Sequence, residues 1–309
     1  MPLTQMRRTI LAKIETTENT DSSPTGSANA IAVSNFEVMP QESEFVERNL
    51  VRAYMGSSES IAASIHQKVT FDVEVAGAGA AGTVPAYDCL LRACGFTPTV
   101  DAGVSVTYDL VSDGFESVTI YAYVDKILHK LTGARGKVTF DFTAKQLGMM
   151  KFEFTGRWRA ATATTLPTSD YGDFVTPVAF NYVNTPTMSV HGYNAAVNAI
   201  SFDTGNNVVY RNMPGRESVD LTDRKMVGNM TIEAPEIGDK DFFTIAKNTT
   251  PGAISLIHGT TAGNIVEVSA PSVTVSEVAY QEQDGVVMLS MKNTYLPVDG
   301  DDEFQLIIR

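Results

Sequence analysis

The sequence is poor in the residues that carry most protein chemistry. Its 309 residues include two cysteines, four histidines and one tryptophan, and only 19% of them are charged. Two cysteines cannot form a disulfide scaffold, and a chain of this length needs none, because it can bury about three quarters of its extended surface. The low charge, together with abundant Thr, Val, Ser and Gly, favours β structure over helices. At about 150 residues per domain, the length suggests two domains.

Long apolar runs are also missing. No stretch approaches the roughly 18 apolar residues that a membrane-spanning helix requires. The short apolar run after Arg7 and Arg8 is interrupted by Lys13, unlike the core of a secretion signal. We therefore expect a soluble protein that is made in a cytoplasm and has no membrane anchor.

Basic residues are too few for a protein that reads nucleic acid or binds an anionic membrane. The chain has 23 Lys and Arg against 36 Asp and Glu, which gives a net charge of −13 and a pI near 4.7. Both classes of partner require a basic face on the protein. Sequence-specific binding of nucleic acid is therefore not expected.

No motif indicates catalysis, a cofactor or a metal. Gly77–Gly82 fits the dinucleotide pattern G-x-G-x-x-G, but the strand before it alternates and the helix after it is short. The histidines lack zinc-site spacing, and no G-x-S-x-G elbow is present. Cys89 and Cys94 are interpreted as small core residues, and Asp299–Glu303 as a solvated turn rather than a calcium loop. We predict neither an enzyme nor a cofactor or metal site.

Alternating apolar and polar residues predict antiparallel sheet. Val69–Val75 alternates throughout, which indicates one buried and one solvated face. Lys137–Thr143 and Met150–Thr155 alternate on either side of a short turn, which predicts a hairpin. Pro85–Cys94 begins with proline and ends before Gly95, which predicts a short helix.

Two N-terminal segments lack this periodicity. Residues 15–30 hold almost no bulky apolar residue, so they are predicted to form an extended arm. Residues 40–66 mix charged and apolar residues without a clear period. Such a segment is unusually long for a connection, and we predict a functional loop.

The order of these elements repeats at an offset of about 150–165 residues. Ile200–Phe202 is similar to Phe36–Val38, and Asn229–Ala234 is similar to Val69–Val75. A Thr-rich, Pro-containing stretch separates the two copies. The predicted organisation is an N-terminal arm and first strand at 1–37, a first β domain at 38–159, a linker at 160–180, and a second β domain at 181–309 that is a divergent duplication of the first.

Six segments carry a resemblance to a known family. They are Thr9–Thr17, Pro24–Ile31, Glu47–Arg52, Ser117–Asp125, Leu128–Lys137 and Phe152–Gly156. They resemble the tail tube, or major tail, proteins of bacteriophages with long non-contractile tails. The resemblance covers residues 1–180 well and the remainder more weakly.

The resemblance implies a mainly β fold, with two tandem antiparallel sandwich or barrel domains that each carry one short helix. It implies a structural protein of the virion tail, assembled in the bacterial host cytoplasm, whose stacked rings form a hollow tube that delivers genome DNA. The implied partners are other copies of the chain, the tape measure protein and DNA inside the tube without sequence-specific binding, and the tail terminator and distal tail proteins at its ends. The alternative is a tail decoration or a receptor- or carbohydrate-binding β-sandwich.

The resemblance also bears on how many chains form one ring. Tubes of this kind resemble six-fold rings with one β domain at each position. Two domains per chain then predict a ring of three chains with pseudo-six-fold symmetry. The alternative is a ring of six chains in which the second domain lies outside the tube.

Two sets of candidate site residues follow. In the 40–66 segment, apolar residues that need a neighbouring ring to become buried are predicted inter-ring contacts: Phe45, Leu50, Val51 and Tyr54. On the polar parity of the alternating strands, carboxylates are predicted to face the tube lumen: Asp141 and Glu153, and with weaker support Glu74 and Glu233. The competing interpretation places these carboxylates on the outer wall.

Overall fold

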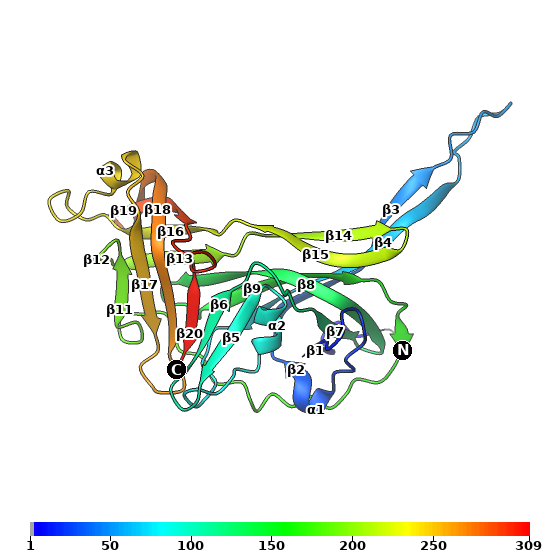
Figure 1. Cartoon of the computed structure of the whole chain (residues 1–309), viewed down its shortest axis with the longest axis horizontal. Coiled ribbons are helices and arrows are strands. Elements are labelled where there is room, and N and C mark those ends of the chain that lie inside the picture. Colours follow the sequence, from blue (N-terminus) through cyan, green and yellow to red (C-terminus); the bar gives the residue numbers. More distant parts are fainter. Residues whose placement is uncertain (1–2) are drawn as a thin grey trace.

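A computed structural model describes residues 3–309, whose regular secondary structure is almost entirely antiparallel strands (Figure 1), which confirms the mainly β prediction. For the described residues up to 180, called the first half, the elements are β1 (Arg8–Ile14), α1 (Gly26–Asn29), β2 (Ala30–Ile31), β3 (Ser34–Glu47), β4 (Ser60–Glu74), α2 (Asp88–Arg92), β5 (Phe96–Asp101), β6 (Ser105–Leu110), β7 (Val118–Val124), β8 (Ile127–Thr143), β9 (Met149–Arg157) and β10 (Thr162–Ala163).

For residues 181–309, called the second half, the elements are β11 (Thr187–Val190), β12 (Tyr193–Asn194), β13 (Val197–Asp203), β14 (Asn206–Met213), β15 (Arg216–Arg224), β16 (Val227–Glu233), α3 (Phe242–Lys247), β17 (Gly252–His258), β18 (Val266–Gln283), β19 (Val286–Tyr295) and β20 (Gln305–Ile308). Among residues 3–309, none of the helices has the length and apolar composition that a membrane crossing requires.

The predicted hairpin of alternating residues is confirmed as β8 and β9. Val138 lies opposite Phe152, and Phe140 lies opposite Met150. All four side chains are at most 2% exposed, because they form one wall of the core. The residues of the other parity face away from that core. The helix predicted at Pro85–Cys94 is also confirmed, although α2 is shorter than the sequence pattern.

Strand pairing follows the same order in both halves. In the first half the order is β3–β4–β9–β8–β7–β1, and in the second it is β13–β16–β19–β18–β17–β11. β10 pairs with the start of β8, as β20 pairs with the start of β18. α2 follows β4, and α3 follows β16. The division into two tandem domains with a linker at 160–180 stays a prediction, and the repeated order is consistent with it.

The two halves share one sheet and one core. β13 pairs with β8, and β20 pairs with β6, so strands of the second half join strands of the first. A single hydrophobic cluster contains Phe140 of β8, Phe202 of β13 and Phe304, whose rings lie within 5.4–5.6 Å of a neighbour in this set. The halves are therefore in continuous apolar contact.

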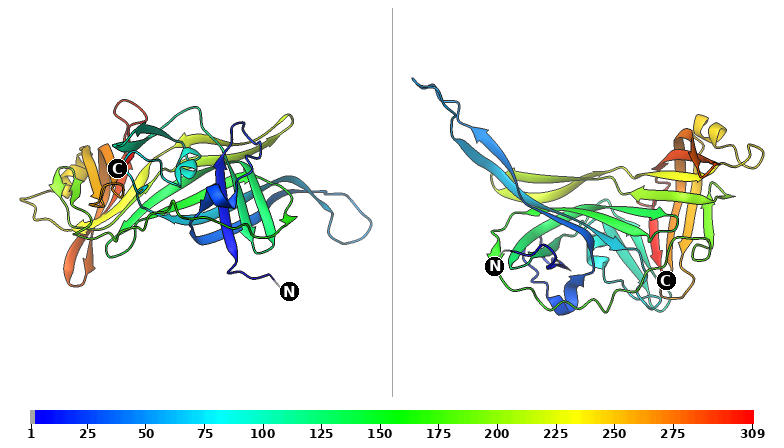
Figure 2. Two further views of the ribbon diagram at one scale, coloured as in Figure 1. Left: turned by 90° about the horizontal axis from the view of Figure 1, so that it is seen from below. Right: turned by 180° about the vertical axis from the view of Figure 1, so that it is seen from behind.

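The segment predicted as a long loop at 40–66 is instead a long hairpin. β3 extends to Glu47 and β4 begins at Ser60, so only the tip lacks strand structure. The hairpin projects well beyond the rest of the molecule (Figures 1 and 2). The loop prediction was wrong for a physical reason: alternation marks a strand with one buried face, and most of this hairpin is solvated on both faces.

Residues 15–30 lie along the first half and do not project. Glu15 is only 7% exposed. Its carboxylate accepts hydrogen bonds from the hydroxyls of Ser117 and Thr119, both at 2.7 Å, and from the backbone N–H of Gly133 at 2.8 Å. Polar contacts of this kind hold a segment that has too few apolar residues to be recognised as packed.

Candidate functional site: a polar sheet face and a projecting hairpin

One polar surface runs across both halves of the molecule. Strands β3, β4, β9, β8, β13, β16 and β19 are neighbours in that order. Asp72 lies opposite Lys151, Lys151 opposite Thr139, and Thr139 opposite Asp203. We call the outward residues of these strands the polar sheet face: Glu37, Lys68, Thr70, Asp72, Glu74, Lys137, Thr139, Asp141, Lys151, Glu153, Ser201, Asp203, Asn229, Thr231, Glu233, Ser290 and Lys292.

The polar sheet face has a surplus of negative charge. Seven of its residues are Asp or Glu and four are Lys, which leaves three carboxylates in excess. Each lysine lies within 3.0 Å of a carboxylate oxygen. Ion pairs at a solvated surface contribute little stability, but they leave little positive charge free to hold an anion.

Asp141 and Glu153, predicted from strand parity, lie on this face. Lys151 Nζ is 2.7 Å from Asp141 Oδ2, and Lys137 Nζ is 3.0 Å from Glu153 Oε2. The hydrogen bond to Asp141 raises the pKa of Lys151 above its ordinary value. Both ion pairs join β8 to β9. The sequence places the lysines on the same parity, but the pairing depends on the strand register.

Glu74 and Glu233 occupy matching places at the ends of two strands. Glu74 ends β4 opposite Met149, and Glu233 ends β16 opposite Met288. Both are exposed, and among residues 3–309 neither has a basic group within 4.0 Å. These carboxylates therefore act more strongly on approaching charges than the paired ones do.

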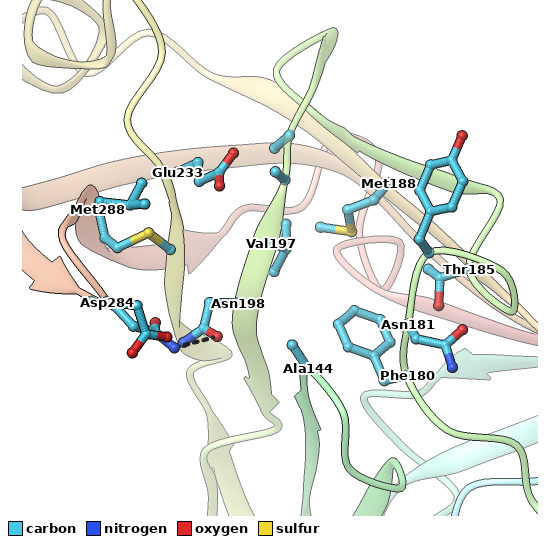
Figure 3. Close-up of a pocket in the computed structure, with 15 residues that line it drawn as sticks. Ala144, Phe180, Asn181, Thr185, Met188, Val197, Asn198, Glu233, Asp284 and Met288 are labelled. Atoms are coloured by element: carbon cyan, nitrogen blue, oxygen red, sulfur yellow. Dashed lines mark hydrogen bonds between the residues drawn. The ribbon is translucent and has the colours of Figure 1, made fainter.

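Glu233 also borders a cavity of about 380 Å³ in the second half. Figure 3 shows Phe180 and Met188 on one side of Val197, and Met288 with Glu233 on the other. The lining is mainly apolar. No group of three metal-binding side chains occurs among residues 3–309.

The β3–β4 hairpin carries all four residues predicted as assembly contacts. Phe45, Leu50, Val51 and Tyr54 are each more than half exposed, and Val51 is fully exposed. Three further apolar residues of the hairpin are equally exposed and were not singled out from the sequence: Val46, Met55 and Ile61. So many exposed apolar side chains on one projection are typical of an interaction surface.

The base of this hairpin is fixed, whereas its tip projects away from the body (Figure 2). The His66 ring stacks on Tyr210 of β14 at 4.8 Å, and the Tyr210 hydroxyl oxygen lies 3.0 Å from the Ile65 carbonyl oxygen. The same hydroxyl lies 2.8 Å from Glu217, which pairs with Arg157 of β9. Burial and the hydrogen bond to Glu217 raise the pKa of Tyr210 to about 12. The β14–β15 hairpin thus orients the projection.

Comparison with known families gives a match over most of the chain. A family model described as phage tail tube protein matches residues 7–299. The match spans most of both halves. No curated protein matches the chain.

Proposed function

The chain belongs to the phage tail tube protein family, and from this membership we infer that it assembles into stacked rings whose channel delivers genome DNA. Membership makes the chain a structural component of the virion tail. The observation that carries the proposal is the polar sheet face, which continues without a break across both halves. A tube wall requires such a sheet, with one face against the core and the other toward a water-filled channel.

In this proposal the polar sheet face lines the channel. Its excess carboxylates repel the phosphates of DNA, and its lysines are already paired with acids. Free basic groups would instead bind phosphates with a salt-dependent affinity and slow the passage of DNA. Asp141, Glu153, Glu74 and Glu233 are the proposed lumen residues, and of these four Glu74 and Glu233 are the ones without an ion-pair partner among residues 3–309.

The β3–β4 hairpin is the proposed contact between rings. Phe45, Leu50, Val51 and Tyr54 would become buried against the next ring of the stack. Burying apolar surface contributes roughly 25 cal/mol per Å², so several such side chains per subunit give a substantial driving force for stacking. The rigid base of the hairpin reduces the entropy lost on docking.

We propose three chains per ring, with residues 38–159 and 181–309 as two tube domains. The repeated strand order supports this number, because each half offers the same arrangement of strands to its neighbours. Further proposed partners are the tape measure protein inside the tube, and the tail terminator and distal tail proteins at its ends.

Negative-stain and cryo-electron microscopy of the purified chain test the proposal. Tubes or rings with three chains and six similar lobes are expected. A ring of six chains with the second half projecting outward would overturn the stoichiometry. A chain that stays monomeric at high concentration and binds glycans would overturn the tube itself in favour of a decoration module.

A further inference from the structure

The joint between the two halves is a short antiparallel strand pair. Residues 199–203 of β13 pair with residues 139–143 of β8. Phe202 lies opposite Phe140, and Ile200 lies opposite Phe142. These four side chains face the core and are at most 1% exposed. The joint therefore combines backbone hydrogen bonds with a buried apolar seam.

Because the strand order repeats, each residue of the joint has an equivalent position, called its counterpart, on the corresponding strand of the other half. Glu74 and Glu233 hold matching places, since Val73 pairs with Met150 and Ile232 with Leu289 in the same strand order. Five residues earlier on these strands stand Val69 and Gly228. Val69 lies opposite Val38. Val227 lies opposite Asp203 in an antiparallel pair, so the next residue, Gly228, lies opposite Phe202. Val38 of β3 is thus the counterpart of Phe202.

The same reasoning applies to β8 and β18. Met150 of β9 lies opposite Phe140, and its counterpart Leu289 of β19 lies opposite Tyr280. Tyr280 is therefore the counterpart of Phe140. Phe140 is buried by β13, whereas Tyr280 is 65% exposed and contacts Phe243 of α3 at 5.4 Å.

Both counterpart strands have a free edge in the single chain. Among residues 3–309, β3 pairs only with β4, and residues 279–283 of β18 pair only with β19. Val38 is partly exposed and Met39 is 49% exposed. Free edges of this kind are ready to pair with another chain unless they are protected.

We propose that β18 of one chain pairs with β3 of a second copy, in the register of the β8–β13 joint. Val38 then lies opposite Tyr280, Met39 opposite Ala279, and Glu37 opposite Gln281. This inference rests on the proposed ring assembly and specifies its interface. Val38 and Tyr280 close the apolar seam, while Glu37 and Gln281 continue the polar sheet face.

Two features limit the length of this pair. Pro40 follows Met39 and has no N–H to donate, so the ladder ends there, as proline on an edge strand allows. At the other end, Arg8 Nη1 donates to the Phe36 carbonyl at 2.7 Å, which occupies one acceptor of β3. The interchain pair is thus centred on Val38, and other contacts of the ring must add to its stability.

Disulfide trapping tests the register. Residues directly opposite in an antiparallel pair have Cα atoms about 4.5–5.5 Å apart, which a disulfide can span. The full chain carrying Val38→Cys and Tyr280→Cys is assembled, oxidised and run on a denaturing, non-reducing gel. The native thiols interfere little, because burial raises the pKa of Cys89 to about 12 and that of Cys94 well above its ordinary value.

The control variant carries Glu37→Cys and Tyr280→Cys, whose side chains would lie on opposite faces of the sheet. We expect the Val38–Tyr280 pair to give a cross-linked fraction at least about tenfold higher than the control, with products ending at three chains. If the Val38 and Tyr280 substitutions prevent assembly, the variant with Met39→Cys and Ala279→Cys tests the same register, because these two residues lie opposite each other on the polar face.

The outcomes separate the interface from the function. If the wild-type chain forms tubes but neither in-register cysteine variant cross-links, the proposed register is wrong and the proposed tube stands. The same holds if the control variant cross-links as much as the in-register variants. Failure of the wild-type chain to form rings or tubes overturns the proposed function itself.

Discussion

Asp141 of β8 and Lys151 of β9 form a diagonal ion pair between neighbouring strands, with 2.7 Å between the carboxylate oxygen and Nζ. Glu153 and Lys137 form a second pair between the same strands. This part of the polar sheet face is therefore close to neutral, and its charge depends on keeping both acids. Replacing the acids alters both the local pairs and the net charge that DNA would meet.

The first prediction concerns the combined substitution Asp141→Lys and Glu153→Lys. It brings four lysines together on two neighbouring strands. Like charges on facing strands cost about 0.2–1 kcal/mol per pair, which a chain of this size tolerates, so rings should still form. Free lysines would bind phosphates, and DNA ejection should slow or stop. Phage infectivity and the rate of DNA release measure the effect.

The matched control replaces the same residues by Asn and Gln, which removes the acids without adding positive charge. Its effect should be much smaller than that of the lysine pair. Undiminished infectivity of the lysine variant would place Asp141 and Glu153 on the outer wall.

The second prediction concerns the projecting hairpin. Ser43 and Ile65 lie opposite each other, so residues 44–64 can be replaced by an Asn-Gly turn that closes the shortened hairpin. The contact of Tyr210 with Ile65 is retained. The variant should keep its thermal midpoint, because the removed apolar residues are exposed, but it should not stack into tubes. Electron microscopy and thermal unfolding measure the two properties.

A milder variant with Val51→Ser and Tyr54→Ser keeps the hairpin and should weaken stacking without abolishing folding. Normal tubes from the shortened chain would show that the hairpin is not the contact between rings.

Strands with one buried face could be predicted from the sequence, and strands that are solvated on both faces could not. Val69–Val75 and the β8–β9 hairpin were predictable, because each strand has one buried face and therefore alternates. The β3–β4 hairpin has little buried surface, so its sequence carries no period. Parity alone placed Asp141, Glu153 and their lysines on one polar surface, but it could not show which lysine pairs with which acid.

The joint between the halves could not be predicted from the sequence for a different reason. Residues 139–143 and 199–203 are far apart in the chain, and no local pattern specifies which strand edges meet. The buried polar groups that support the joint are equally hidden. Asn and Arg are residue types that usually lie at the surface, yet Asn206 and Arg135 are each less than 9% exposed.

The third prediction tests that joint through Asn206. Its Nδ2 donates to the carbonyls of Cys94 at 2.7 Å and Gly136 at 3.1 Å. Asn206→Ala leaves these buried acceptors with fewer donors and should lower the free energy of unfolding by about 1–3 kcal/mol. Asn207→Ala is the control, since Asn207 is exposed and, within residues 3–309, its side chain donates only to Thr222. Urea unfolding of both variants measures the difference, and equal stabilities would contradict the assigned role.

The last prediction concerns His258, which is 2% exposed. Because a carbonyl can only accept, Nε2 donates to Val178 O at 3.1 Å, and Nδ1 accepts from the Thr185 hydroxyl at 3.1 Å. Burial lowers the pKa of His258 below its ordinary value. Below about pH 6.5 the unfolded chain therefore binds a proton that the folded chain does not. Stability should fall as the pH decreases from 6.5 toward the folded-state pKa, by at most about 1.4 kcal/mol per pH unit.

Urea unfolding of the unassembled chain between pH 8 and pH 5.5 measures this dependence. His129 and His191 act in the same direction, because burial lowers the pKa of each of them. Comparison with His258→Asn isolates the contribution of His258: the variant is less stable at pH 8, but its stability should fall less steeply below pH 6.5. An NMR titration that places the pKa of His258 at or above 6.5 would contradict the prediction, since a histidine that protonates as readily in the folded chain as in the unfolded one adds no pH dependence.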